Sequence, residues 1–503
     1  MPAPAYEGFD LGHAFQSFIS LQVCSQKQCR REGEAVVAAK GVACSRPPPP
    51  RRAELDAVAK QFTMRRMITN PSSSPSQTRR DFIKTSATFS AALAAPAILS
   101  GNLMAAANSD TLRIGLVGCG GRGSGAAAQA LKADKNVILT AMGDTFPEAL
   151  QSSLKSLQGE KELADKVKVA PDHCFVGLDA YQKVIASGVD VVLLASPPGF
   201  RPVHLKAAVE AGKHIFCEKP VATDSPGVRS VLASAKLAKE KSLSLVTGFC
   251  WRYEGARREF YKRIHDGAIG DLRAVYATYY TGQVKPMPPA SARAKDMGDL
   301  EWQLRNWYNF TWLSGDGLVE QAVHSVDKIA WAMKDVAPLK AVAVGGRQTP
   351  NHEGNIFDHM FVTYEYPDDV RAFLGQRQIS NCANENSDYL MGAAGFGKIP
   401  GWQAPIIRGK ENWKYRGPNT DMYQQEHNEL FASIRAGAAH NDGEWMARST
   451  LLALMGRMAA YTGQEVTWED ALNSKDRLVP ETLDWNMKLP VAPMAIPGFT
   501  KLN

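Results

Sequence analysis

The chain has 503 residues, of which 45% are hydrophobic and 22% are charged, close to the averages for soluble globular proteins. This composition excludes a wholly disordered chain, a collagen-like fibre and a polytopic membrane protein, and the length predicts about two to four domains. Residues 1–100 hold 13 basic against 7 acidic residues, whereas residues 101–503 hold 45 against 44. The main body therefore lacks the basic excess that is typical of proteins binding nucleic acid or anionic lipid.

The first hundred residues carry the pattern of an export signal. Thr78–Lys84 contains paired arginines and precedes Ser86–Leu99, an uncharged and Ala-rich run that is too short to span a membrane comfortably. The small residues Met104–Ala107 follow. Paired arginines, a weakly hydrophobic run and a small-residue cleavage region are typical of a twin-arginine signal peptide.

The start of this signal indicates where the protein begins. Translation from Met64 or Met67 would give the signal an ordinary length, so we expect residues 1–63 to be disordered or untranslated. Residues 64–108 are then the signal peptide, which predicts a periplasmic protein that meets the membrane only transiently during export. Because the twin-arginine pathway moves folded proteins, an exported redox enzyme would carry its cofactor with it.

A strand, a glycine-rich turn and a helix follow one another in the order that dinucleotide binding requires. Leu112–Val117 is typical of a buried parallel strand and leads into the turn Gly118–Gly123, which contains Gly121 and Arg122. In this G-x-G-x-x-G pattern Gly118 permits the turn, Gly120 lets the backbone approach a pyrophosphate, and Gly123 lets the following helix pack closely.

An acidic residue then favours one of the two nicotinamide cofactors. Asp144 follows the predicted strand Asn136–Met142, at 21 residues after Gly123, where an acid binds the ribose hydroxyls of NAD. A carboxylate at this position repels a 2′-phosphate, which favours NAD over NADP. NADP remains the alternative cofactor, because Arg122 places a positive charge in the glycine turn.

Two further predicted strands end in residues suited to a cofactor site. Val189–Ala195 ends at Ser196-Pro197, and Lys213–Cys217 ends at Glu218-Lys219-Pro220. The carboxyl ends of parallel strands face the cofactor crevice. A lysine there can donate to or deprotonate a substrate hydroxyl, although a lysine in a loop is more commonly exposed to solvent.

The cysteines do not indicate a metal site. The five that follow residue 101 show no C-x-x-C spacing and lie in apolar or Gly-rich runs: Cys119, Cys174, Cys217, Cys250 and Cys382. We expect them to be buried free thiols, with no metal bound.

The chain resembles the Gfo/Idh/MocA family, the glucose–fructose oxidoreductase and inositol dehydrogenase group of NAD(P)-dependent enzymes. The residues that carry the resemblance are Gly118–Gly123, Asp144, Ser196-Pro197, Glu218-Lys219-Pro220 and Glu320…His324. The resemblance runs from about residue 111 to residue 478. It implies an α/β Rossmann domain with a doubly wound parallel sheet, here residues 109–245. An α+β domain with an open, mostly antiparallel sheet follows, here residues 246–503. It also implies carbohydrate or polyol substrates and a homodimer or homotetramer formed through the second sheet.

The same resemblance assigns the residues around the nicotinamide. It makes Lys219 the catalytic lysine, and it makes Glu218 and Pro220 the residues that shape the loop beneath the nicotinamide. It gives Asp144 to the adenosine ribose. Arg252, in the segment that enters the second domain, would reach the cofactor or the substrate.

The family's catalytic Asp-x-x-x-His corresponds here to Glu320…His324, so glutamate replaces an aspartate that is one methylene shorter. Spacing of four residues places both side chains on one face of a helix, and Asp327 follows on nearly the same face. His324 is then positioned as general base toward a C–OH group, with Glu320 or Asp327 orienting it.

The second half of the chain has the mixed texture of an α+β domain. Asn381–Asn419 is predicted to form long loops. An aromatic cluster suits either the faces of sugar rings or core packing: Trp302, Trp307, Tyr308, Phe310 and Trp312. Strands are predicted at Leu272–Tyr280, Lys340–Gly345, Asp358–Tyr366 and Val370–Ile379, and helices at Met422–Gly437 and Glu444–Gly463.

The sequence therefore predicts an exported NAD-dependent oxidoreductase that transfers hydride between a carbohydrate or polyol hydroxyl carbon and a tightly bound nicotinamide. An NAD-recycling glycoside hydrolase or lyase, acting through transient oxidation of a sugar, is the alternative. A sugar-binding protein with a vestigial redox fold is a third interpretation.

Overall fold

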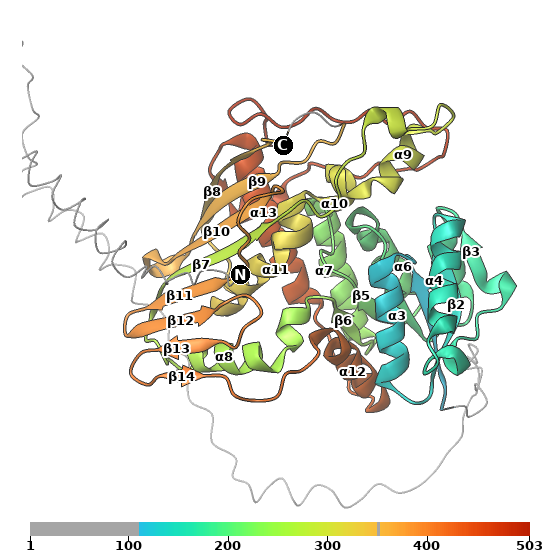
Figure 1. Cartoon of the computed structure of the whole chain (residues 1–503), viewed down its shortest axis with the longest axis horizontal. Helices are drawn as coiled ribbons and strands as arrows, with labels where there is room; N and C mark the ends of the chain where they lie inside the picture. Colours follow the sequence, from blue (N-terminus) through green and yellow to red (C-terminus); the bar gives the residue numbers. More distant parts are fainter. Residues whose placement is uncertain (1–109, 350–352, 503) are drawn as a thin grey trace, which may run out of the picture. The chain divides into compact units, whose positions relative to one another are not determined.

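Two β-sheets organise the computed structural model, which describes residues 110–349 and 353–502 (Figure 1). The predicted extension 1–63 and the predicted signal peptide 64–108 lie outside the described residues. Sheet A is parallel and has six strands, and sheet B is mostly antiparallel and has nine. The predicted fold class is confirmed.

Sheet A forms because its strands are short, continuous aliphatic runs that can be buried on both faces. Their order is β3-β2-β1-β4-β5-β6, and all neighbours are parallel. This is the strand order of doubly wound dinucleotide-binding sheets. The strands are β1 (Leu112–Val117), β2 (Val137–Asp144), β3 (Cys174–Val176), β4 (Val191–Leu194), β5 (His214–Cys217) and β6 (Leu245–Thr247).

Helices in the crossover connections cover this sheet. Small residues let α3 lie close to it, since Ala126, Ala127 and Ala130 are fully buried. Asp224 caps α7 by accepting a hydrogen bond from the backbone N–H of Gly227 at 2.8 Å. The helices are α3 (Gly121–Ala133), α4 (Pro147–Gly159), α5 (Ala180–Ala186), α6 (Arg201–Glu210) and α7 (Ser225–Glu240).

One helix from the C-terminal half completes the cover of sheet A. Helix α12 (Met422–Arg435) packs on α3, and its Leu430 and Phe431 are buried in the same core as Ile114 and Leu116 of β1. The domain boundary after residue 245 stays a prediction. The hydrophobic core that contains Ile114 and Leu116 includes residues from both sides of that boundary.

Sheet B has the order β14-β13-β12-β11-β7-β10-β9-β8-β15, with one parallel pair, β7 and β10, at its centre. The four strands predicted in this region are confirmed. The strands are β7 (Leu272–Thr281), β8 (Lys340–Gly346), β9 (His359–Glu365), β10 (Arg371–Gln378), β11 (Asp388–Gly392), β12 (Gly395–Ile399), β13 (Ile406–Arg408), β14 (Trp413–Lys414) and β15 (Val466–Thr467).

The prediction of long loops over 381–419 is wrong, because β11 to β14 extend the sheet through this segment. Glycines in the strands hid the alternation of apolar and polar residues. A Cβ on Gly397 would lie 2.7 Å from Phe260 Cζ of helix α8 (Gly255–His265), so the sheet needs a residue without a side chain there.

Helices cover one face of sheet B and join it to sheet A. Helix α13 (Gly443–Thr462) packs on β8, β9, α7 and α11 (Val323–Ala332), and Gly463, in the left-handed conformation, ends it as predicted. The short helices α9 (Asp299–Arg305), α10 (Thr311–Ser314) and α14 (Trp468–Asn473) flank this assembly. Within the described residues, no helix combines the length and the apolar character that crossing a membrane requires.

We expect Gly123→Ala to destabilise the fold, because the added Cβ would lie 1.9 Å from the carbonyl oxygen of Gly118. Helix α3 would have to move away from β1, and we expect a loss of about 2 kcal/mol in the free energy of unfolding, measured by urea denaturation. Gly121→Ala is the matched control, since a Cβ there meets no atom within 4 Å. Equal stability of the two variants would contradict this account of the turn.

Candidate active site

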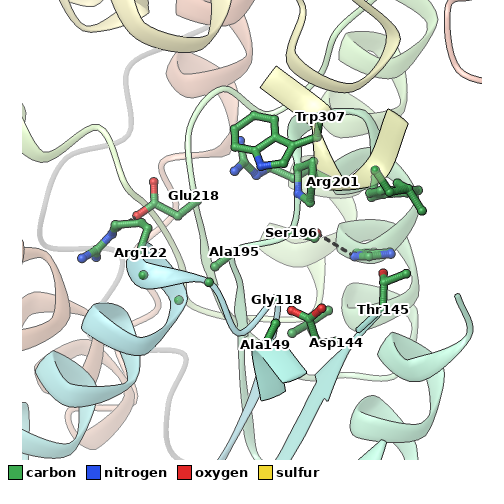
Figure 2. Close-up of a pocket in the computed structure, with 18 of the residues that line it drawn as sticks. Gly118, Arg122, Asp144, Thr145, Ala149, Ala195, Ser196, Arg201, Glu218 and Trp307 are labelled. Carbon is green, nitrogen blue, oxygen red and sulfur yellow. Dashed lines mark hydrogen bonds and ion pairs between the residues drawn. The ribbon is translucent and has the colours of Figure 1, made fainter. Parts of the chain in front are cut away.

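A cavity of about 750 Å³ lies at the carboxyl ends of the sheet A strands. Residues of the glycine turn, Asp144 and Ser196 line one side of it, and residues that follow β7 and residues of α9 and α11 line the other. This is the position at which doubly wound sheets bind ligands. Figure 2 shows the cavity, with Gly118 and Asp144 at one end and Trp307 toward the other.

The glycine turn fits a dinucleotide. Gly118 has a φ of +93°, which favours glycine, and a Cβ on it would lie 2.5 Å from the backbone nitrogen of Ser196. Gly120 and Gly121 instead face open space, since a Cβ on either would meet no atom within 4 Å. The turn therefore leaves room for a pyrophosphate at the N-terminus of α3, where free backbone N–H groups favour anions.

Asp144 is the last residue of β2 and lines the cavity. Its carboxylate accepts hydrogen bonds from the backbone N–H groups of Cys119 at 2.6 Å and Phe146 at 2.9 Å. Burial raises the pKa of Asp144 above its ordinary value, and these two hydrogen bonds oppose the rise. The carboxylate thus holds the glycine turn against the end of β2 while remaining part of the cavity wall.

Arg122 points away from Asp144. Its guanidinium forms ion pairs with Glu218 and with Glu426 of α12, the latter at 3.2 Å, and lies 5.0 Å from the ring centre of Tyr423. Figure 2 shows Arg122 and Glu218 together, apart from Asp144. The ion pairs link the glycine turn to the loop that carries Lys219.

Glu426 is fully buried, and burial and then the charge of Glu218 raise its pKa well above its ordinary value. One of its carboxylate oxygens has no hydrogen-bond partner among the described residues. Arg122 therefore has two buried acidic partners, and Glu218 lies away from Asp144 (Figure 2).

Lys219 and Glu320 meet inside the cavity, although 101 residues separate them. The Lys219 Nζ donates to the backbone carbonyl of Glu320 at 2.7 Å and lies 3.3 Å from its Oε1. The other carboxylate oxygen of Glu320 accepts from Gln321 Nε2 at 2.6 Å, and Tyr279 Oη donates to the Gln321 Oε1 at 2.7 Å. Both oxygens of Glu320 are thus engaged, and the arrangement holds the Lys219 ammonium at the strand end.

The segment that carries Glu320 is a π-helix, Leu318–Ala322, which continues into α11. The sequence spacing predicts an ordinary helical turn here. Asp316 lies just before this turn: its backbone has a φ of +105°, and its buried carboxylate accepts from the N–H groups of Leu318 at 3.1 Å and Phe357 at 2.9 Å. Such single π turns are frequent at functional sites.

His324 lines the cavity beside this pair. Its Nδ1 is buried and has no hydrogen-bond partner among the described residues. Burial, and then the positive charges of Lys219 and Lys328, lower the pKa of His324 well below its ordinary value. The imidazole is therefore neutral at physiological pH, and one of its ring nitrogens is a hydrogen-bond acceptor.

Three of the predicted site residues are not among those that line the cavity. Arg252 forms ion pairs with Asp327 at 2.9 Å and Asp335 at 2.6 Å, and Asp327 also accepts from Ser449 Oγ of α13 at 2.7 Å. Asp327 thus faces α13. The carbonyl of Pro220 accepts from Arg201 Nη1 at 2.5 Å.

The structure brings the remaining predicted site residues together around one cavity. They are Gly118, Gly120, Gly121, Arg122, Gly123, Asp144, Ser196, Pro197, Glu218, Lys219, Glu320 and His324. Their individual roles stay predictions.

Sequence reasoning missed several lining residues. Arg201 and His204 follow the β4 strand end by a few positions, which is a weak signal that could have found them. His204 Nδ1 lies 3.0 Å from Ser196 Oγ, and burial lowers the pKa of His204 to about 3. Lys285 lies in an irregular segment and offered no signal.

The aromatic cluster has two uses. Trp307 and Tyr308 line the cavity. Trp302, Phe310 and Trp312 are buried in a separate core, where apolar residues of the C-terminal segment pack against them: Leu478, Val479, Leu483, Met487, Leu489 and Val491. This segment also bonds to α9, since the Leu489 carbonyl accepts from Gln303 Nε2 at 2.6 Å.

Comparison with known proteins identifies the nucleotide-binding half. Residues 112–249 match the oxidoreductase family with an NAD-binding Rossmann fold, GFO_IDH_MocA. This segment is therefore similar to the NAD-binding domain of the Gfo/Idh/MocA oxidoreductases. The chain is also 24% identical over 339 residues to an inositol 2-dehydrogenase of Rhizobium meliloti (strain 1021), which covers 66% of this chain and 93% of that relative.

Solved structures share the two-sheet fold. An aldose–aldose oxidoreductase from Caulobacter crescentus, complexed with glycerol, has a TM-score of 0.56 at 18% identity, covering 71% of this chain and 99% of its own. The WlbA dehydrogenase from Bordetella pertussis, in complex with NADH and UDP-GlcNAcA, has a TM-score of 0.55 at 19% identity, covering 71% and 98%. At these identities the likeness concerns the fold alone.

We expect the His324 ring to titrate below pH 6.5, because burial and the neighbouring Lys219 ammonium disfavour its protonated form. Lys219→Met removes one of the two positive charges that disfavour protonation of His324. The titration midpoint of His324 should then rise toward pH 6.5 without passing it, since the ring stays buried. NMR titration of the histidine side chains measures both, and His324→Gln assigns the resonance. A midpoint at or above 6.5 in the unsubstituted protein would contradict the described environment.

Proposed function

We propose that this oxidoreductase transfers hydride between a hydroxyl-bearing carbon of a carbohydrate or polyol and NAD. The observation that carries the proposal is the meeting of Lys219, Glu320 and His324 in a cavity whose other end is the glycine turn. The name of the inositol 2-dehydrogenase relative, which acts on a polyol, supports the substrate class.

In this proposal the two ends of the cavity have different functions. The glycine turn and the N-terminus of α3 would hold the pyrophosphate, and Asp144 would accept from the ribose hydroxyls. The chemistry that bound NAD supplies is hydride acceptance at its nicotinamide ring.

The proton of the substrate hydroxyl passes to a residue of the chain. Neutral His324 accepts it, and the Lys219 ammonium donates a hydrogen bond to the same oxygen as it becomes a carbonyl. Glu320 orients Lys219 through the contact at 3.3 Å. In this assignment Glu320 is a positioning residue, since both of its carboxylate oxygens are already engaged.

We further propose NAD in preference to NADP. The carboxylate of Asp144 lies at the ribose end of the cavity, where it would repel a 2′-phosphate. Arg122, the cation of the glycine turn, is bound to Glu218 and Glu426. Mass spectrometry of nucleotide that co-purifies with the protein tests this choice, and NADP alone would contradict it.

Retention of the cofactor is supported by the cover over the ribose end. Arg305 of α9 forms an ion pair with Glu148 of α4 at 2.6 Å, and its guanidinium lies 4.1 Å from the ring centre of Phe146. These contacts join α9 to α4, and all three residues line the cavity, so they favour retention of a nucleotide bound there.

Lys219→Ala should abolish turnover and leave NAD affinity nearly intact, because the pyrophosphate and ribose contacts lie elsewhere. The assay follows absorbance of reduced nicotinamide with a panel of sugars and polyols, and nucleotide affinity is measured separately by fluorescence. Release of sugar from a glycoside without net nicotinamide reduction would favour the recycling hydrolase. Full activity of the variant would exclude Lys219 from the reaction.

We also propose that the protein is a homodimer or homotetramer joined through sheet B. Helices α11 and α13 cover one face of that sheet, and large apolar side chains are exposed on β8, β9 and β12: Val342, Val344, Phe361 and Phe396. Val344 lies opposite Phe361 in the register and is 69% exposed. An apolar row of this kind favours burial against a second copy.

Light scattering on the purified protein should give a mass of two or four chains. Val344→Lys with Phe361→Lys should shift it to one chain, and Val203→Lys, an exposed apolar position on α6, is the control. A single-chain mass for the unsubstituted protein would contradict the proposal.

Export is the remaining proposal, supported by Arg79-Arg80 and the apolar run that follows. Expression from Met64 in a bacterium with an active twin-arginine pathway should yield periplasmic protein whose N-terminus lies near residue 108. Arg79→Lys with Arg80→Lys should hold it in the cytoplasm as a longer chain. Unchanged processing of that variant would contradict the signal.

A further inference from the structure

Some of the cations that line the cavity form ion pairs with carboxylates, and others do not. Three of its cations have carboxylate partners: Arg122 with Glu218 and Glu426, Lys219 with Glu320, and Arg305 with Glu148 and Glu301. Two others, Arg201 and Lys285, have no carboxylate partner in the part of the chain that the structure describes.

Arg201 is the more unusual of the two because it is only 4% exposed. Its Nη1 donates to the backbone carbonyl of Pro220, and its Nε is buried without a hydrogen-bond partner among the described residues. A buried guanidinium without a counter-ion costs free energy, and proteins normally retain one only where an anion completes it.

The position of Arg201 separates it from the cofactor's phosphates. Those phosphates are assigned to the glycine turn and the N-terminus of α3, whereas Arg201 begins α6 and contacts the loop that carries Lys219. In Figure 2 it lies toward Trp307, away from Asp144 and Thr145. Lys285 belongs to the same end, since its Nζ lies 5.6 Å from the ring centre of Trp307.

Glu320 does not satisfy these two cations. Its carboxylate is within reach of Lys219 and Gln321 through one oxygen each. The Lys219–Glu320 pair is neutral as a whole, so Arg201 and Lys285 are the cations of the cavity lining that form no ion pair with a carboxylate of the described residues.

We propose that the substrate carries a carboxylate, as a sugar acid or polyhydroxy acid does, and that Arg201 and Lys285 bind it at the Trp307 end of the cavity. This inference rests on the proposed function and narrows its substrate class. Arg201 supplies the fixed, planar donors that match a carboxylate, and Lys285, which is exposed, supplies charge at the entrance.

Matched pairs of compounds test the proposal on the NAD-loaded enzyme: D-glucuronate with D-glucose, D-galacturonate with D-galactose, and D-gluconate with D-sorbitol. We expect the acid of at least one pair to be preferred by about 10- to 100-fold in kcat/KM, the range that one charged hydrogen bond supports. Calorimetric titration of the same pairs should show the same preference in Kd, independently of turnover.

Arg201→Gln should remove the preference, because it should raise KM for the acid by a larger factor than KM for the neutral compound. Lys285→Gln should lower the preference by a smaller factor, because Lys285 is exposed. Lys183→Gln, a surface lysine of α5, is the control for loss of a positive charge. The NAD dissociation constant should be the same in all of these variants.

Equal kcat/KM and equal Kd within every pair would overturn the carboxylate site. So would an Arg201→Gln variant that loses NAD affinity or loses both members of a pair equally, because Arg201 would then serve the cofactor or the loop. Oxidation of the neutral compounds alone would overturn this inference and leave the proposed function standing. Acid-selective binding without any nicotinamide reduction would support the site and count against the proposed function.

Discussion

The contact between Lys219 and Glu320 is the interaction on which the rest of the site depends. It joins the end of β5 in sheet A to the π turn before α11, and it is made twice, through the carbonyl at 2.7 Å and through Oε1 at 3.3 Å. Because each partner comes from a different sheet's assembly, the pair exists only when both are folded and docked. The cavity, the position of His324 and the environment of Arg201 all follow from that docking.

Two further sets of polar contacts hold the partners of this contact in place. On the Lys219 side, Arg122 ties the glycine turn to Glu218, the residue before the lysine. On the Glu320 side, Asp316 sets the start of the π turn and is itself held by Tyr461 of α13. Burial raises the pKa of Asp316 to about 6, so its hydrogen bonds form in a region that water does not reach freely. The glycine-turn end and the Lys219 end of the cavity are thereby linked through packed structure.

Sequence patterns located some parts of the site better than others. The glycine turn, Asp144 and the strand ends were predicted at their observed places, because parallel strands and their turns are encoded within short stretches of chain. Arg252 and Asp327 were placed near the reaction but pair with each other, since spacing along a helix does not reveal which neighbour each face meets. Arg201 and Lys285 went unnoticed, because an unpaired charge is visible only when all of its surroundings are known.

The sequence by itself determined the order of strand, turn and acid, the neutral balance of the main body and the residue types available for proton transfer. Local backbone preferences and the spacing of apolar residues are enough for these. Only the tertiary structure showed that α12 covers sheet A and that residues 381–419 contain strands in spite of their glycines. It also showed which cations form ion pairs with a carboxylate. Those outcomes depend on contacts between residues tens to hundreds of positions apart, where packing and desolvation, and no local pattern, set the free energy.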